Sequence, residues 1–114
     1  MTPAPPDDFL PLHPDAFRIL LVLEGGASHG YAIVKDLEAA PDRPGRVLPA
    51  NLYRRIRTLR DQGLIEEVAP PDDEPDMDER RRYFGLTPLG LGVARAEARR
   101  LAALVERAGR LLGA

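Results

Sequence analysis

The sequence predicts a mainly α-helical fold with one small β-hairpin, on the strength of three observations. Apolar residues recur at helical spacing in three segments before residue 63 and in a fourth after residue 87. Two short stretches of β-forming residues, 64–69 and 80–87, flank a loop of prolines and acids. Prolines and glycines mark the helix ends. Three helices, a hairpin and a long last helix make a winged helix-turn-helix followed by a C-terminal helix.

At 114 residues the chain has the length of one domain, which a second subunit would help to stabilise. It has no cysteine and only two histidines, so we expect no structural zinc, no other metal and no cofactor. It has neither an apolar run of about twenty residues nor a signal-peptide pattern, and no catalytic motif. We therefore expect a cytoplasmic protein that is not an enzyme and does not associate with membranes.

The net charge of −2 conceals two opposed blocks. Residues 43–60 contain six arginines and no acid, whereas residues 66–79 contain eight acids and no base. Because binding to phosphate depends on the local field rather than on net charge, the first block suits a DNA-binding face. A solvated helix surface is the other interpretation of such a run.

The N-terminal third of the chain predicts a tail and two helices. Residues 1–12 hold four prolines and two aspartates, which indicates a mobile tail. The first helix begins near Pro14, is apolar nearly all round and ends at Gly25, so it must be covered on several sides. Ser28 is expected to cap the second helix, which Pro41 stops.

The third helix, predicted over residues 49–62, is amphipathic and rich in arginine. Its apolar side holds Leu52, Ile56 and Leu59. The opposite side and its flanks hold Ala50, Asn51, Tyr53, Arg54 and Arg57. Gly63 supplies a left-handed residue after the last turn. One face is therefore predicted to dock on the domain and the other to enter the major groove of DNA.

The outer face of this helix has the side chains that read or grip DNA. Arg54 and Arg57 are of the type that pairs with guanine or with phosphate. Asn51 can read adenine and Ala50 can contact a thymine methyl group, although Asn51 has helix capping as an alternative role. Tyr53 either contacts a phosphate or packs against the second helix.

Other DNA contacts are expected outside the third helix, namely from Tyr31, Lys35, Arg46, Arg80, Arg81 and Arg82. Packing is the alternative for Tyr31, and simple solvation is the alternative for Lys35. The wing, residues 65–86, has an acidic tip that phosphate would repel. A second hypothesis therefore makes the chain a protein-interaction module whose wing loop, residues 70–79, binds a basic partner.

The winged domain is predicted over residues 13–87 and a C-terminal helix over residues 88–114. Apolar residues of this last helix recur at spacings of four and three, close to a coiled-coil seam. Together with part of the first helix, this seam is expected to form a homodimer interface from Phe17, Leu20, Leu21, Ala94, Ala98, Leu101, Leu104, Val105, Ala108 and Leu112. Packing back on the first helix is the alternative, and both can hold.

Several local motifs, taken in order, resemble the PadR-like family of transcriptional regulators between Phe17 and Leu112. The motifs are His29-Gly30-Tyr31-x-Ile33, Asn51-Leu52-Tyr53, Gly63-Leu64-Ile65 and Arg81-Arg82-Tyr83-Phe84-x-Leu86-Thr87-x-x-Gly90. The single helix after the wing resembles the shorter C-terminal type of the family. Pro49-Ala50-Asn51 departs from the small residue and threonine common in the family, so no operator sequence follows from the resemblance.

This resemblance implies a dimeric repressor that binds double-stranded DNA, with residues 49–62 in the major groove and the wing on the flanking backbone. A palindromic operator follows from a two-fold symmetric dimer. The resemblance also implies regulation by a small-molecule effector, for which the apolar first and last helices could line a pocket at the dimer interface.

Overall fold

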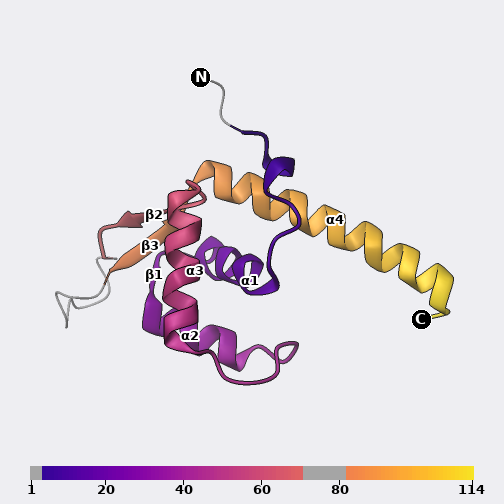
Figure 1. Cartoon of the computed structure of the whole chain (residues 1–114), viewed down its shortest axis with the longest axis horizontal. Helices are drawn as coiled ribbons and strands as arrows, with labels where there is room; N and C mark the ends of the chain where they lie inside the picture. The colour runs from indigo at the N-terminus through magenta and orange to yellow at the C-terminus, as the bar shows by residue number, and fades with distance from the viewer. Residues whose placement is uncertain (1–3, 71–81) are drawn as a thin grey trace.

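The computed structural model describes residues 4–70 and 82–114. The winged helix-turn-helix has helices α1 (Pro14–Glu24), α2 (Gly30–Ala39) and α3 (Pro49–Asp61), followed by strands β2 (Ile65–Val68) and β3 (Tyr83–Leu86). Helix α4 (Pro88–Leu112) then runs along one side of this body and extends well beyond it (Figure 1). The predicted fold class is confirmed. In the described ranges, no helix is both long and apolar enough to cross a membrane.

A third strand, β1 (Ser28–His29), joins the predicted hairpin and makes an antiparallel sheet in the order β1-β3-β2. Ser28 pairs with Phe84 and His29 with Tyr83. The prediction that Ser28 caps α2 was therefore wrong, because its backbone lies in the sheet. His29 caps the helix instead, since its Nδ1 accepts the Ala32 N–H at 3.2 Å.

Helix α1 lies at the centre of the core, in contact with α2, α3, β3 and α4. Leu20 is completely buried among apolar residues of the same chain, so its assignment to a dimer interface was wrong. Ala94 of α4 is also buried in this cluster, and Phe17 packs against it. The physical reason is that the α1 helix, apolar on nearly every side, is covered by its own domain. The alternative of packing back on α1 thus holds for the first part of α4.

The predicted end of α3 is confirmed in detail. Gly63 adopts the left-handed conformation, with φ of 78°. Its N–H donates to the Arg60 carbonyl, and the Leu64 N–H donates to the Leu59 carbonyl, both at 3.0 Å. This is a Schellman motif, and the fully buried Leu64 supplies its hydrophobic contact.

The start of α4 is attached directly to this turn. Thr87 donates its hydroxyl to the Gly63 carbonyl at 2.6 Å and caps α4 by accepting the Gly90 N–H at 2.9 Å. The Thr87 N–H donates to the Leu64 carbonyl at 3.2 Å. Gly90 lies so close that a Cβ atom would overlap the Leu64 carbonyl oxygen. The beginning of α4 is therefore positioned by the end of α3.

The prediction of a mobile tail is corrected for residues 4–12, which pack along α4. Pro6–Phe9 forms a 3-10 helix, and Phe9, Leu10 and Leu12 pack against the core. The Leu12 N–H donates to Glu97 Oε2 at 2.7 Å, and Glu97 is only 1% exposed. Arg100 also donates to the Glu97 carboxylate. Glu97 thus holds the N-terminal segment through a hydrogen bond to Leu12, 85 positions earlier in the sequence, and apolar contacts add to it. The high proline content of the segment had indicated no such structure.

Replacing Gly90 with alanine tests the close approach between α4 and the turn after α3. The new methyl group would force one of the two backbones to move, so Gly90→Ala should lower the free energy of unfolding by about 1–3 kcal/mol. Gly109→Ala is the matched control within α4, because its Cβ would meet only the carbonyl oxygen of Ala114 at the chain end, at 3.2 Å. It should be neutral or gain up to about 1 kcal/mol. Equal stability of the two variants in urea denaturation would contradict the close approach.

The anchor of the N-terminal segment predicts a pH-dependent contribution to stability. The hydrogen bond from Arg100 lowers the pKa of Glu97 below its ordinary value of 4.5, against burial, which raises it. The ionised carboxylate therefore stabilises the fold fully above about pH 4.5, and this contribution is lost as the pH falls through the folded-state pKa. Glu97→Gln should lower the free energy of unfolding at neutral pH by about 1.5–3 kcal/mol.

The difference between Glu97→Gln and the wild type should shrink in acid, as followed by urea denaturation at several pH values. Glu106→Gln is the control, because its ion pair with Arg110 is exposed and should contribute little. A Glu97→Gln deficit that stays constant into strong acid would show that the carboxylate charge is not what stabilises this contact.

Candidate nucleic-acid interface

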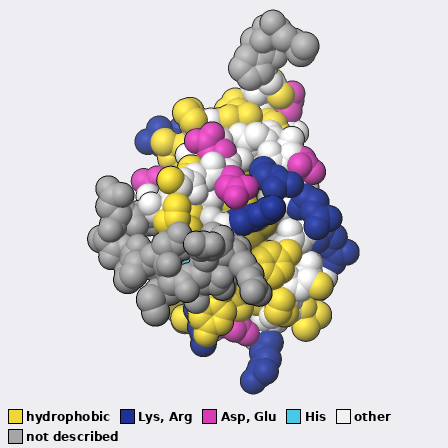
Figure 2. All heavy atoms as spheres, turned by 90° about the vertical axis from the view of Figure 1, so that its left-hand side faces the viewer, with side chains coloured by type: hydrophobic (Ala, Val, Ile, Leu, Met, Phe, Trp, Pro, Cys, Tyr) yellow, Lys and Arg dark blue, Asp and Glu magenta, His cyan; other side chains and the backbone are white. Residues whose placement is uncertain are grey.

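The structure separates the two predicted faces of α3. Leu52, Ile56 and Leu59 are buried in the core. The side chains predicted to contact DNA are all exposed, namely Ala50, Asn51, Tyr53, Arg54 and Arg57. A space-filling view shows Lys and Arg side chains gathered in a band on one side of the molecule (Figure 2). A rigid helix, anchored by its apolar face, thus presents a cationic surface to solvent.

The N-terminal turn of α3 joins two of the predicted base-reading residues. Leu48 is the N-cap residue and makes no side-chain cap, and the helix begins at Pro49. The alternative role of Asn51 as the cap was therefore wrong, because Asn51 already lies inside the first turn. Its Oδ1 instead accepts a hydrogen bond from Arg54 Nη2. Each of these exposed side chains holds the other in position on the outer face.

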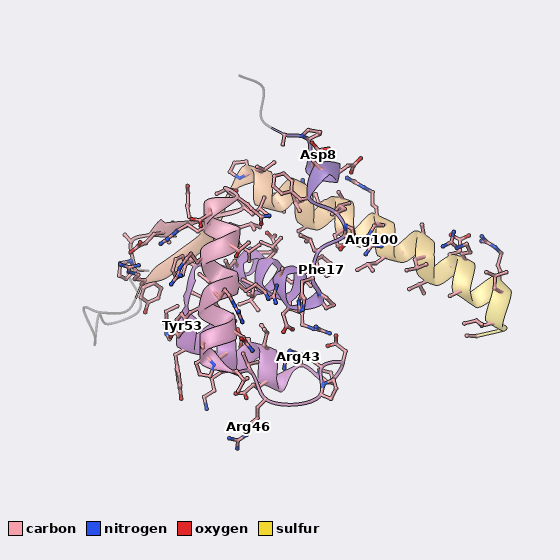
Figure 3. All side chains as sticks on the ribbon, viewed as in Figure 1. Asp8, Phe17, Arg43, Arg46, Tyr53 and Arg100 are labelled. Carbon is pink, nitrogen blue, oxygen red and sulfur yellow. The ribbon has the colours of Figure 1, made fainter. Side chains whose placement is uncertain are left out.

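Tyr53 packs against the second helix, as one of its two predicted roles requires, and it also remains exposed to solvent. Its ring packs on Gly30 at the start of α2, where a Cβ atom would lie only 2.7 Å from Tyr53 Cε1. The side chain is nevertheless 52% exposed, and Figure 3 shows it at the outer edge of α3. Packing on α2 therefore orients the ring without removing it from solvent.

The start of α2 presents an aromatic and a cationic side chain together. Tyr31 is exposed, stacks on His29 with 6.4 Å between ring centroids, and lies under Lys35, whose Nζ is 5.3 Å from the ring centroid. His29 in turn meets the edge of Tyr83 in the sheet, at 5.2 Å. The sequence analysis included His29 only as part of a family motif and assigned the capping role to Ser28, so it missed that His29 is the cap. Through it, the sheet positions Tyr31 and Lys35.

The arginines before α3 divide into a structural and a free residue. Arg43 donates to both carboxylate oxygens of Asp15, at 2.7 and 3.0 Å. This hydrogen bonding lowers the pKa of Asp15 and raises that of Arg43. Arg46 is exposed and points away from the body of the protein (Figure 3). Arg43 therefore ties the loop to α1, whereas the Arg46 charge is available to a partner.

Only part of the predicted wing surface lies in the described residues. Arg82 is exposed, with its Nε 3.8 Å from Glu67 Oε1 across the hairpin. Arg80, Arg81 and residues 71–79 of the acidic loop lie outside the described residues. The wing thus contributes one described cation, which a neighbouring carboxylate partly offsets.

The C-terminal half of α4 leaves the domain (Figure 1). Its large apolar side chains are exposed along one stripe of the helix. Leu101 and Ala108 are partly buried, whereas Ala98 and Leu104 are exposed. Val105 is 69% exposed and Leu112 78%. On α1, Leu21 is exposed as well. A row of large exposed apolar side chains along one helix is typical of an interaction surface.

Comparisons with known proteins agree with this architecture. Residues 19–96, more than half of the chain, match the model of the transcriptional regulator PadR-like family. A PadR family transcriptional regulator from Eggerthella lenta is 31% identical, with a TM-score of 0.62 over 82% of this chain and 80% of that one. A PadR family regulator from hypervirulent Clostridium difficile is similar in fold, with 18% identity, a TM-score of 0.70, and 86% and 97% coverage.

A transcriptional regulator from Clostridium thermocellum is also similar in fold. It has 23% identity and a TM-score of 0.69, with 84% of this chain and 87% of that chain covered. Among curated proteins no match is found.

Proposed function

This chain belongs to the PadR-like family of transcriptional regulators, and we propose that it acts in the cytoplasm as a homodimeric, sequence-specific repressor. The observation that supports the DNA-binding part is the exposed arginine face of α3 on a helix whose other face is buried. Such a helix can enter the major groove without rearrangement of the domain behind it.

Base reading is proposed for four residues on the outer face of α3. Arg54 and Arg57 can each form two hydrogen bonds with guanine, while Asn51 and Ala50 suit adenine and the thymine methyl group. In the free protein, Arg54 donates a hydrogen bond to the side-chain oxygen of Asn51. Reading a base therefore replaces an existing hydrogen bond, which penalises sequences that cannot offer an equivalent one.

Backbone contacts are proposed for the residues around α3. Tyr31 and Lys35 extend from the start of α2, Arg46 from the preceding loop and Arg82 from the wing. These side chains carry no direct sequence information but determine how the helix lies in the groove.

Dimerisation is proposed through the exposed stripe of α4, residues 98–112, and Leu21, which is exposed on α1, is proposed as a further contact. A two-fold dimer would place two α3 helices on half-sites about one helical turn apart, on a palindromic operator. The space between the subunits, lined by this stripe and by Leu21, is where we place a small-molecule effector.

Removal of both arginines from the outer face of α3 tests the DNA-binding proposal. Arg54→Ala/Arg57→Ala should lose at least about tenfold in affinity for a duplex from the promoter region of its own gene. The slope of log Kd against log salt should also fall by about one for each phosphate group that the variant no longer binds. Fluorescence anisotropy with labelled duplex at several KCl concentrations measures both quantities.

Arg99→Ala/Arg107→Ala removes the same two charges from exposed positions on α4 and should leave DNA affinity unchanged. Wild-type affinity in the Arg54→Ala/Arg57→Ala double variant would contradict the assignment of α3 as the recognition helix.

A charge placed in the apolar stripe tests the dimer. Val105→Glu puts a carboxylate where the proposed interface would bury it unpaired, so the dimer should dissociate at micromolar concentration in analytical ultracentrifugation. Because Val105 is exposed within the protomer, the fold itself should persist by circular dichroism. Arg99→Glu, on the polar side of α4, is the control and should remain dimeric. A Val105→Glu dimer as stable as the wild type would place the interface elsewhere.

A further inference from the structure

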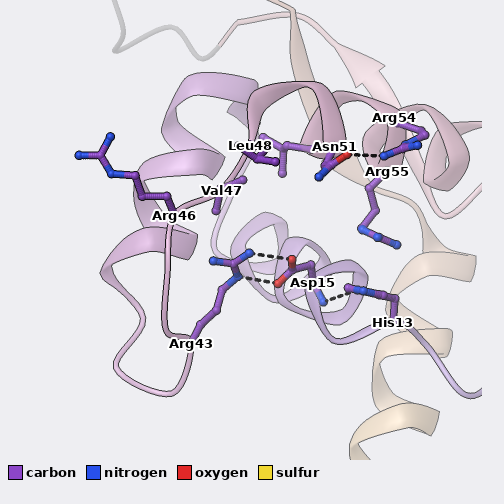
Figure 4. A pocket seen from close by; sticks show the side chains of 10 residues that line it. His13, Asp15, Arg43, Arg46, Val47, Leu48, Asn51, Arg54 and Arg55 are labelled. Carbon is purple, nitrogen blue, oxygen red and sulfur yellow. Dashed lines mark hydrogen bonds and ion pairs between the residues drawn. The ribbon is translucent and has the colours of Figure 1, made fainter.

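A pocket of about 280 Å³ opens between the start of α1, the loop before α3 and the first turns of α3 (Figure 4). Its lining includes four arginines, Arg43, Arg46, Arg54 and Arg55, and a single acid, Asp15. This volume lies just below the range of about 300–1,000 Å³ usual for drug-sized ligands. The pocket therefore suits one compact anionic group better than an extended apolar molecule.

The one acid in the lining has little capacity left to accept hydrogen bonds. Both oxygens of Asp15 are engaged by Arg43, and Oδ1 also accepts from Arg18 at 3.2 Å. Glu38, the other carboxylate close to Arg43, accepts the Val47 N–H at 3.2 Å. The acids near the pocket are thus committed to holding the loop and α1 together.

Several hydrogen-bond donors of the pocket, by contrast, are not engaged by the acids near it. Arg55 extends from α3 toward the space beside His13, and among the described residues it has no ion pair (Figure 4). His13 accepts the Asp15 N–H at Nδ1, so in its neutral form the hydrogen is on Nε2, which is a donor. Asn51 uses its oxygen for Arg54, which leaves its amide N–H groups. The pocket is rich in donors and poor in acceptors, as a site for an oxyanion must be.

We infer that this pocket is a phosphate-ester site, in which Arg55 is the main ligand and His13 and the Asn51 amide complete the donor set. A planar guanidinium binds two phosphate oxygens at once, and the Arg43–Asp15 pair provides a fixed wall opposite it. The phosphate comes either from the DNA backbone or from a small phosphorylated molecule. The first source rests on the proposed function, because the pocket shares Asn51 and Arg54 with the proposed base-reading face.

Occupation by the DNA backbone has a geometric consequence. A phosphate held at Arg55 lies beside the first turn of α3 and so sets the depth and angle at which Asn51 and Arg54 meet the bases. Arg55 would then contribute affinity equally on every sequence, whereas Arg54 and Arg57 contribute to discrimination between sequences.

The test has one arm without DNA and one with it. In the first, the melting temperature of the full chain is measured in inorganic phosphate and in chloride at equal ionic strength. Phosphate in the millimolar range should raise the melting temperature above its value in chloride. Arg55→Ala should abolish this difference, Arg55→Lys should retain part of it, and Arg107→Ala should retain all of it.

In the second arm, affinity for a promoter duplex and for an unrelated duplex is measured over a range of KCl concentrations. Arg55→Ala should weaken both by roughly the same factor, about tenfold, and reduce the salt slope by about one. Arg46→Ala, at an exposed position, is a second variant that should act in the same direction without affecting folding.

The outcomes separate the two sources and separate this site from the proposed function. A phosphate effect with an unchanged salt slope in Arg55→Ala would assign the pocket to a small phosphorylated molecule. If the wild type binds DNA, but phosphate has no effect beyond that of chloride and Arg55→Ala binds DNA like the wild type, the pocket proposal is overturned and the proposed function stands. If the wild type binds no DNA at any salt concentration, the proposed function fails, and the first arm alone decides the pocket.

Discussion

The junction between the end of α3 and the start of α4 is the constraint on which the rest of the structure depends. Gly63 turns the chain, Leu64 enters the core, and Thr87 returns from the sheet to bond both residues. Only a glycine fits at position 90, against the Leu64 carbonyl. The end of α3, the hairpin and the start of α4 therefore meet at one set of backbone contacts. The direction in which α4 leaves the domain is coupled to the direction of α3.

This coupling would allow a small domain to serve the two proposed partners, DNA and a second copy of the chain. The outer face of α3 is free because its inner face and its last turn are fully used. The far half of α4 is free because only its first half is needed to complete the core. A dimer formed through that far half would transmit its geometry to the spacing of the two α3 helices. Any ligand that shifts α4 would change the fit to a palindromic site, which is a physical route to regulation.

Local signals made most of the helix boundaries predictable. The Thr87 cap, the Gly63 turn and the amphipathic pattern of α3 each depend on residues within one or two turns, so they can be recognised without the fold. Strand β1 and the N-terminal segment could not be predicted in this way. A two-residue strand has no period of its own, and Leu12 is held by Glu97, which is distant in the sequence. The residues of the phosphate-ester pocket likewise come from two separate segments of the chain.

The sequence by itself determined the order of the four helices and the hairpin, the opposite faces of α3 and the apolar stripe of α4, because periodicity and capping are local properties. Only the tertiary structure decided which residues of those patterns are exposed and unpaired, and therefore able to contact a partner. Leu20 is buried in the core while Val105 remains exposed. Arg43 and Arg55 line the same pocket, but Arg43 is paired with Asp15, whereas Arg55 has no ion pair among the described residues. Availability depends on partners that folding brings together from distant positions. Composition cannot distinguish a buried leucine from an exposed one, or a paired arginine from an unpaired one.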